Sequence, residues 1–252
     1  MPSRRGFLVS ASGALLLSGC DAAVENERVD GVIKSAETLS RRAQSLLLSG
    51  DRMAREFTEA DMSPVFKVNG TEKPEGDAYA ELLDGKFAAW RLVVDGKVRQ
   101  PLTLSLADLK KLPARTQITR HDCVEGWSAI GKWTGVPLAL VLQAAGLASD
   151  ARFAVFHCAD EYEKTMDGNG QYYESLDLVD AFHPQTILAY GMNDADLTVG
   201  HGAPLRLRVE RQLGYKHAKY LMRIEIVDSF RAIGRGRGGF WEDRGYEWYA
   251  GI

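Results

Sequence analysis

The chain has 252 residues, of which 45% are hydrophobic, enough to bury one sizeable core, and this excludes an intrinsically disordered chain. Its formal net charge of −3 gives no general attraction to polyanions, so we expect no nucleic-acid partner. Three cysteines are too few for a disulfide framework, and 25 glycines beside 8 prolines suit a mixed β structure with many tight turns.

Residues 1–20 have the layout of an export signal. Arg4 and Arg5 precede the apolar stretch Phe7–Leu17, which is too short to cross ~30 Å of hydrocarbon as a permanent helix. Cys20 resembles the lipidation site of bacterial lipoproteins, and the paired arginines resemble a twin-arginine signal, a route for proteins that fold around a cofactor before export. We therefore expect a lipid-anchored protein in the periplasm or on the outer face of the cytoplasmic membrane.

The spacing of apolar residues predicts the elements that follow. Helical spacing between Val29 and Ser49 predicts a packing helix, within a helical segment over residues 21–60. Alternation after Trp90 runs into Asp95-Gly96, which predicts a β-hairpin with a two-residue turn between residues 87 and 104. Two short helices are predicted, Leu106–Leu112 capped by Ser105, and Pro137–Ala145 ended by Gly146.

Further along the chain, short runs rich in β-branched and aromatic residues are predicted to be strands: Thr116–Cys123, Arg152–Cys158, Ile187–Tyr190, Leu205–Val209 and Met222–Val227. The tail Gly234–Ile252 is rich in glycine and aromatic residues, so we expect it to pack onto the core. No repeat or low-complexity linker marks an internal boundary. The expected organisation is one α+β domain over residues 61–252, with mixed β-sheets and short helices.

Cys123 ends one of these strands, and Gly126 then lets the chain turn away from the sheet. Arg120 and His121 would favour the thiolate, the form that acts as nucleophile and as soft metal ligand, whereas Asp122 opposes it. From these residues alone, a buried thiol, a metal ligand and a catalytic nucleophile all stay open.

The residues around Cys123 are the first of several motifs that occur in order. They are Cys123-Val124-Glu125-Gly126-Trp127, residues 172–176, Leu188-Ala189-Tyr190, Asn193, His201-Gly202-Ala203-Pro204-Leu205-Arg206 and Gly214-Tyr215-Lys216-His217-Ala218-Lys219. In order and spacing they resemble the molybdopterin-binding domain of the sulfite oxidase family, over roughly residues 85 to 230. The resemblance implies a sulfite-oxidase-like molybdopterin-binding fold and a two-electron oxygen-atom transfer at molybdenum, which cycles between its +6 and +4 states.

The resemblance also implies the site. Cys123 would be the protein's ligand to one molybdenum per chain, beside the two sulfurs of a pterin dithiolene, with no dinucleotide attached. Arg206 and Lys219 would bind the pterin phosphate. The remaining residues implied in cofactor binding are Arg120, His121, His201, Lys216, His217 and Ala218. Tyr172 stands where the family has an active-site tyrosine, and the candidates for a substrate pocket are Trp127, Tyr173 and Trp241.

The chain departs from the family at the substrate. Trp127 and Ser128 stand where sulfite oxidases have two arginines that help hold the anionic substrate, so a sulfoxide or N-oxide is a better expectation than sulfite. His201 stands where a periplasmic branch resembling protein-methionine-sulfoxide reductase has asparagine, so that substrate is not transferred. No Cys-x-x-Cys-His motif is present, so we expect no haem in this chain and a separate, cytochrome-like electron-transfer partner.

Two other functions stay open. One is a cysteine-dependent hydrolase or thiol enzyme that uses Cys123 with His121 or His157 as base. The other is a non-catalytic lipoprotein that binds a partner through its aromatic tail. Cys158 is expected to be a core residue, although a disulfide between Cys123 and Cys158 would exclude the metal site.

Overall fold

The computed structural model describes residues 52–166 and 170–252, which belong to one compact unit. The predicted export signal, Cys20 and the predicted helix between Val29 and Ser49 lie outside the described residues. Of the helical segment expected over residues 21–60, the structure describes residues 52–60. There Glu56 bridges Thr119 and the 3-10 turn η1 (Glu59–Asp61) begins. No helix in the described part is long and apolar enough to cross a bilayer.

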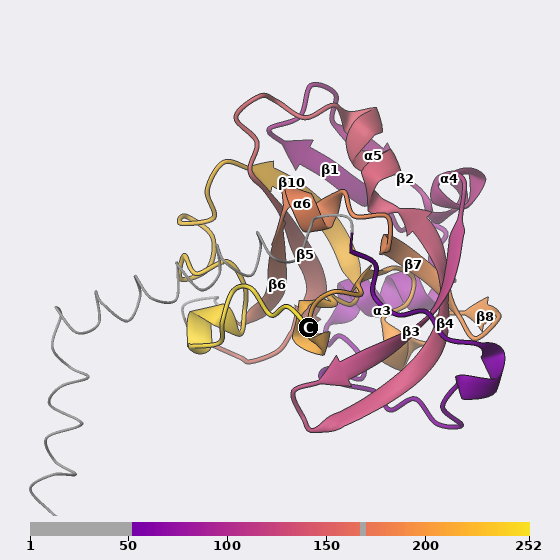
Figure 1. Ribbon diagram of the computed structural model, residues 1–252. Coiled ribbons are helices and arrows are strands. Elements are labelled where there is room, and N and C mark those ends of the chain that lie inside the picture. The colour runs from indigo at the N-terminus through magenta and orange to yellow at the C-terminus, as the bar shows by residue number, and fades with distance from the viewer. Residues whose placement is uncertain (1–51, 167–169) are drawn as a thin grey trace, which may run out of the picture. The chain divides into compact units, whose positions relative to one another are not determined.

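One mixed sheet has the strand order β2-β1-β10-β5-β6 (Figure 1). Its strands are β1 (Leu92–Gly96), β2 (Leu102–Leu104), β5 (Phe153–Glu161), β6 (Gln171–Asp177) and β10 (Leu221–Val227). β1 and β2 form the predicted hairpin, but the predicted two-residue turn at Asp95-Gly96 is wrong. Both residues extend β1 along β10, where they pair with Glu225 and Ile226, and residues 97–101 make the connection.

The second sheet is antiparallel and has the order β3-β4-β7-β8, with β9 also paired to β7. Its strands are β3 (Arg115–Cys123), β4 (Trp127–Pro137), β7 (Thr186–Met192), β8 (Ala195–Asp196) and β9 (Arg206–Val209). The β4–β7 register shifts at Gly135, where a Cβ atom would lie 2.2 Å from the carbonyl oxygen of Leu188. All five predicted strands are confirmed, while β4, β6 and β8 were not predicted.

Short helices connect the strands. They are α3 (Asp77–Asp84), α4 (Leu106–Lys111), α5 (Leu138–Ala145) and α6 (Leu178–Ala181), with the 3-10 turns η2 (Val199–His201), η3 (Gly214–Lys216) and η4 (Glu242–Arg244). The backbone N–H of Asp108 donates to the hydroxyl of Ser105, which caps α4 as predicted. α5 follows Pro137 directly and ends at Gly146, so both predicted helices are confirmed.

The main core lies against both sheets. Leu92 of β1, Phe156 of β5 and Leu188 of β7 are fully buried in it, together with Leu142 of α5. Alternate residues of β7, such as Ile187, face a smaller cluster around Trp133. This arrangement of mixed sheets and short helices is the predicted α+β class.

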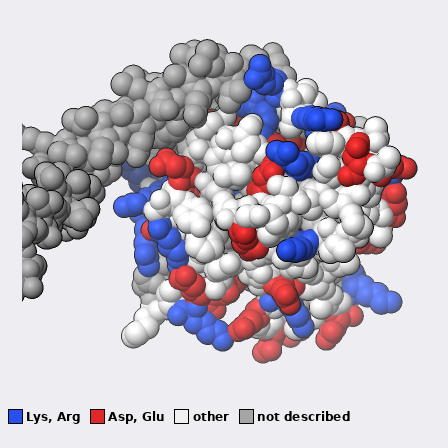
Figure 2. All heavy atoms as spheres, turned by 60° about the horizontal axis from the view of Figure 1, so that its bottom comes forward, with Lys and Arg blue, Asp and Glu red and all other residues white. Residues whose placement is uncertain are grey.

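The C-terminal tail packs down, as predicted. Phe240 is fully buried in the main core, and the backbone N–H of Ile252 donates to the carbonyl of Arg211. Acidic and basic side chains are interspersed over the face drawn in Figure 2, in keeping with the small net charge.

Candidate active site

A pocket of about 200 Å³ lies where β3, β5 and β6 meet the tail. Five residues singled out from the sequence line it: Cys123, Tyr172, His217, Lys219 and Trp241. They come from the end of β3, from β6, from the segment between η3 and β10, and from the tail. The fold therefore brings together positions that are far apart in the sequence.

The rest of the wall was given no role from the sequence, although Val124, Glu125, Gly214 and Tyr215 belong to the quoted motifs. The loop before α3 contributes Asn69, Gly70 and Thr71, the turn after β3 contributes Val124 and Glu125, and the other residues are Asp160, Tyr162, Gly214, Tyr215 and Tyr246. Asp160 had a usable signal, because a carboxylate that follows directly on an apolar strand marks a polar strand end. The loop at Asn69 had none, since it precedes every motif that carried the resemblance.

Cys123 is placed by a tight turn. Gly126, with φ +84°, donates its backbone N–H to the carbonyl of Cys123, and Cys123 pairs with Trp127 across the turn. The thiol is free and half-buried, and Cys158 is free and buried, so no disulfide removes the possible ligand. Cys158 is thus the core residue predicted.

The protonation of Cys123 differs from the expectation. Burial raises the pKa of the Cys123 thiol, and the Glu125 carboxylate adds to the rise. The two cations expected to favour thiolate do not act on it, because Arg120 pairs with Asp122 at 2.9 Å and burial lowers the pKa of His121 well below its usual value. A metal would have to displace the proton on binding.

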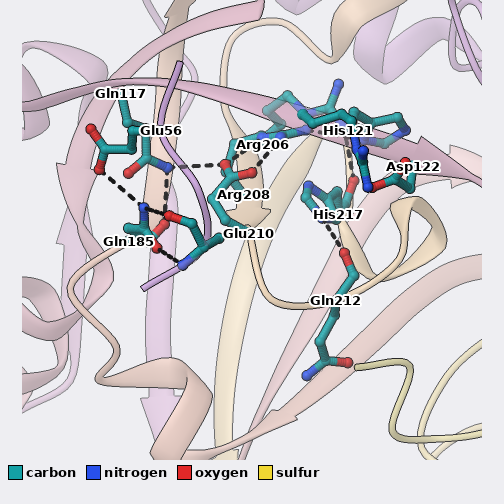
Figure 3. Close-up of polar contacts among 12 residues, drawn as sticks. Glu56, Gln117, His121, Asp122, Gln185, Arg206, Arg208, Glu210, Gln212 and His217 are labelled. Atoms are coloured by element: carbon teal, nitrogen blue, oxygen red, sulfur yellow. Dashed lines mark hydrogen bonds and ion pairs between the residues drawn. The ribbon is translucent and has the colours of Figure 1, made fainter. Parts of the chain in front are cut away.

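Two neutral histidines, His121 and His217, lie side by side (Figure 3). His217 lines the pocket, and His121 lies behind it. Arg208 Nη1 donates to Nδ1 of His121 at 3.1 Å, so the proton of His121 is on Nε2. His217 Nε2 lies 3.0 Å from the carbonyl of Gln212 and donates to it, which leaves Nδ1 of His217 as an acceptor without a protein partner. Burial lowers the pKa of His217 well below its usual value, and nearby Arg208 adds to this, so the imidazole stays neutral.

A buried polar network holds this side of the pocket (Figure 3). The guanidinium of Arg208 pairs with Glu210 through two bonds of 2.9 and 2.6 Å, and both side chains are fully buried. Gln117 donates to Glu210 at 2.9 Å and to the carbonyl of Gln185 at 3.0 Å. The network fixes β3 against β9 and so fixes the orientation of His121.

Gly214 is required where η3 passes this network. A Cβ atom there would lie 2.5 Å from Nε2 of His121, closer than side chains can approach. The glycine therefore allows η3 to lie directly against β3 and to present Tyr215 to the pocket.

The two residues implied in phosphate binding hold backbone segments together. Arg206 is fully buried behind the pocket and donates to the carbonyls of His201 and His217. The ammonium of Lys219 is on the pocket wall and donates to the carbonyls of Asn69 and Gly200, at 2.7 and 2.9 Å. Burial lowers the pKa of Lys219 to about 7.

Carboxylates dominate the charge of the pocket. Asp160 is 3% exposed, burial raises its pKa to about 6, and its Oδ1 has no protein partner. Glu125 lies on the wall next to Cys123. Among the described residues that line the pocket, Lys219 is the single lysine, and there is no arginine.

The donor set fits a molybdenum–pterin group. Cys123 supplies one soft sulfur ligand, which suits a metal that brings dithiolene sulfurs with it. The orphaned buried atoms on the wall, Nδ1 of His217 and Oδ1 of Asp160, are groups that a polar pterin could pair with. Among residues 52–166 and 170–252, no three His, Cys, Asp or Glu side chains gather as a metal site.

Other residues expected at the site lie elsewhere. Lys216 is buried between Glu174 and Glu242, and the hydroxyl of Tyr173 donates to Asp243 at 2.6 Å, so neither side chain lines the pocket. Tyr173 faces away from the pocket because it follows the pocket residue Tyr172 along β6, whereas Lys216 lies in the 3-10 turn η3, next to the pocket residue Tyr215. The rest are also off the wall: Arg120 is exposed, Trp127 packs on His121, His201 lies 3.2 Å from the carbonyl of Phe66, and Ala218 is buried.

Neither histidine expected to act as base for Cys123 is placed to do so. Nδ1 of His121 is occupied by Arg208, and His157 lies 2.9 Å from Glu225 in the other sheet. Neither histidine lines the pocket. A thiol enzyme that uses His121 or His157 as base therefore has no support in the geometry.

Comparisons with known proteins show the family to which the chain belongs. The family model described as oxidoreductase molybdopterin binding domain matches residues 80–232. A putative protein-methionine-sulfoxide reductase subunit YedZ1 of Azospira oryzae is 35% identical over 100% of this chain and 88% of its own length. The protein-methionine-sulfoxide reductase catalytic subunit MsrP of Xanthomonas campestris is 33% identical over 88% of this chain and 68% of its own. Among solved structures, the sulfane dehydrogenase SoxCD of Paracoccus pantotrophus superposes on 56% of this chain and 38% of its own chain, with 24% sequence identity and a TM-score of 0.49.

Proposed function

Because the chain belongs to the oxidoreductase molybdopterin binding domain family, we propose that this molybdopterin-dependent oxidoreductase reduces sulfoxides with electrons from a separate redox protein. The overall reaction consumes one sulfoxide, two electrons and two protons and yields one thioether and one water. The bound molybdenum–pterin group supplies the two-electron centre for oxygen-atom transfer. The chain's own residues hold that group, exclude charged competitors and orient the sulfoxide.

The residues that would hold the cofactor are those with free bonding capacity at the pocket. The sulfur of Cys123 is the protein's metal ligand. Nδ1 of His217 would accept a hydrogen bond from the pterin, and Asp160 would take part through its free oxygen Oδ1. Lys219 lies on the same wall, but its ammonium already donates to the carbonyls of Asn69, Thr71 and Gly200, so the pterin phosphate would have to replace one of these bonds.

The charge of the pocket is the observation that carries the choice of substrate. Sulfite is an anion, and Glu125 and Asp160 would repel it while Lys219 is already bonded to backbone carbonyls. A sulfoxide is neutral, and its alkyl groups and sulfur suit the rings of Tyr162 and Trp241, whose centroids lie 5.3 Å apart. The names of the similar reductases support the same choice.

The remaining parts of the proposal come from the sequence. The protein is exported by a twin-arginine-type signal and anchored by lipid at Cys20, so it works in the periplasm or on the outer face of the cytoplasmic membrane. Electrons then come from a cytochrome-like partner in or at that membrane. Mass spectrometry of the mature N-terminus tests the anchor, and an unmodified residue other than Cys20 at that terminus would refute it.

The test of function uses protein made with its export signal in cells that synthesise the cofactor. Wild type, Cys123→Ser and the buried-thiol control Cys158→Ser are assayed for molybdenum content, for methionine sulfoxide reduction by a reduced viologen dye, and for sulfite oxidation by ferricyanide. We expect about one molybdenum per chain and a kcat/KM for sulfoxide at least tenfold above that for sulfite. Cys123→Ser should lose activity while Cys158→Ser keeps it. A preference for sulfite, or full activity in Cys123→Ser, would overturn the proposal.

A further inference from the structure

Three charged side chains meet in the interior beside the pocket. The ammonium of Lys216 lies 2.6 Å from Oε2 of Glu174 and is also bonded to Oε1 of Glu242. All three side chains are at most 1% exposed. We call them the Lys216 cluster.

The Lys216 cluster is costly unless it stays assembled. Two carboxylates share one ammonium, and one oxygen of each, Oε1 of Glu174 and Oε2 of Glu242, has no protein partner. Burial raises the pKa of Glu174 well above its usual value, and the nearby Glu242 adds to this. Buried charges that lose their partner are strongly destabilising, so the segments that carry them are held together.

Each of the three segments also supplies the pocket. On β6, Tyr172 lines the pocket and Glu174 belongs to the cluster. In η3, Tyr215 lines the pocket and Lys216 belongs to the cluster. In the tail, Trp241 lines the pocket and Glu242 follows it directly. The cluster therefore lies one or two residues from three parts of the wall.

The tail carries the third member of the cluster, Glu242. In Figure 1 it is the yellow chain that follows β10 and ends the molecule. Its rings at Trp241 and Tyr246 pack on each other at 5.1 Å, and Tyr246 also contacts Tyr215 at 5.3 Å. The tail makes several described contacts with the segments that line the pocket. Among them, the bond between Glu242 and Lys216 is a buried ion pair.

We propose that the Lys216 cluster positions the Trp241–Tyr246 wall of the pocket and thereby determines how tightly the substrate is held. This inference rests on the proposed sulfoxide reduction for its substrate, but not for the anchoring itself. Lys216, Glu174 and Glu242 act through the wall and are positioning residues.

Glu242→Ala is the sharpest perturbation, because it removes the tail's end of the bond and leaves Lys216 and Glu174 as a balanced pair. The matched control is Glu247→Ala, since Glu247 lies in the same tail with an exposed side chain, and Tyr215 bonds only its backbone carbonyl. Glu242→Gln keeps an acceptor for Lys216 and should behave as wild type.

The first measurement is amide hydrogen exchange of the molybdenum-loaded protein. The N–H groups of Phe240, Asp243 and Arg244 are hydrogen-bonded within or to this segment, so their protection reports its anchoring. We expect exchange at least tenfold faster in Glu242→Ala, and unchanged exchange in Glu242→Gln and Glu247→Ala. Unchanged protection in Glu242→Ala would overturn the anchor, whether or not wild type reduces sulfoxides.

The second measurement is a double-mutant cycle on steady-state sulfoxide reduction. Glu242→Ala and Trp241→Ala should each raise KM about fivefold with kcat and molybdenum content within about twofold of wild type. If the cluster acts through the wall, KM of the double variant should also rise only about fivefold. Independent effects on KM would instead multiply to a rise of about 25-fold. A multiplied KM, or a fall in kcat that follows loss of molybdenum, would overturn the positioning role. Absence of sulfoxide reduction in wild type would refute the proposed function alone, because the exchange experiment still decides the anchor.

Discussion

Replacing Arg208 by Met should destabilise the protein strongly, because it leaves Glu210 charged and fully buried without its two-bond partner. Breaking a buried pair from one side costs about 3–5 kcal/mol. The variant also loses the bond to His121 and the contact of the guanidinium with the ring of Trp133, at 4.3 Å. For a domain of this size, that corresponds to a melting temperature lower by about 6–20 °C.

The same reasoning predicts that a second change restores stability. In Arg208→Met with Glu210→Leu, neither member of the pair is left as an unpaired buried charge, and Gln117 keeps its bond to the carbonyl of Gln185. Apolar replacement of both partners of a buried pair is often neutral, so the double variant should recover to within about 1–2 kcal/mol of wild type.

Thermal and denaturant unfolding of wild type and the two variants measure this. Lys110→Met is the control, because it breaks a pair with Asp196 whose side chains are 39% and 83% exposed and should change the melting temperature little. The reasoning is refuted if Arg208→Met melts like Lys110→Met, or if the double variant is less stable than the single one.

Three more outcomes follow from single positions. Gly214→Ala should lower molybdenum content in purified protein several-fold, because the added Cβ would lie 2.5 Å from Nε2 of His121 and displace η3 from the pocket. Asp160→Asn should change the pH dependence of unfolding: burial raises the pKa of Asp160 to about 6, so wild type should lose about 3 kcal/mol relative to the variant as pH rises from about 4 through 6. Ser105→Ala should cost about 1 kcal/mol in urea unfolding through loss of the α4 cap.

Each of these has a contrary result. Full molybdenum content in Gly214→Ala would mean that η3 moves without affecting the pocket. A constant stability difference between Asp160→Asn and wild type from pH 4 to pH 7 would mean that Asp160 titrates at its ordinary pKa. An unchanged urea midpoint in Ser105→Ala would mean that the cap adds nothing to α4.

Local patterns predicted helix ends and strands that are rich in apolar residues. Ser105 and Gly146 mark helix ends by their own chemistry, and the strand ending at Cys123 alternates buried and partly exposed residues. β6 escaped prediction because its buried run includes the polar residues Glu174 and Ser175, which in sequence resemble solvated residues. β4 escaped because glycines such as Gly135 occupy its interior, where close backbone contacts require them.

The site was predictable to the extent that motifs marked it. Cys123, His217 and Lys219 belong to motifs and line the pocket together. The position of Lys216 was not predictable from its motif, because its partners Glu174 and Glu242 are distant in sequence and form a charge cluster only in the folded chain. A basic residue next to a cofactor motif can therefore be a structural cation.

The pocket wall joins residues 69–71 to residues 241–246, with the strands of both sheets between them. A nascent chain on the ribosome that has not yet released Tyr246 lacks one wall of the site, however well its sheets have formed. Cofactor capture must then follow synthesis of this last segment, and a premature stop codon just before Trp241 would yield a protein with Cys123 in place but with no enclosed site around it.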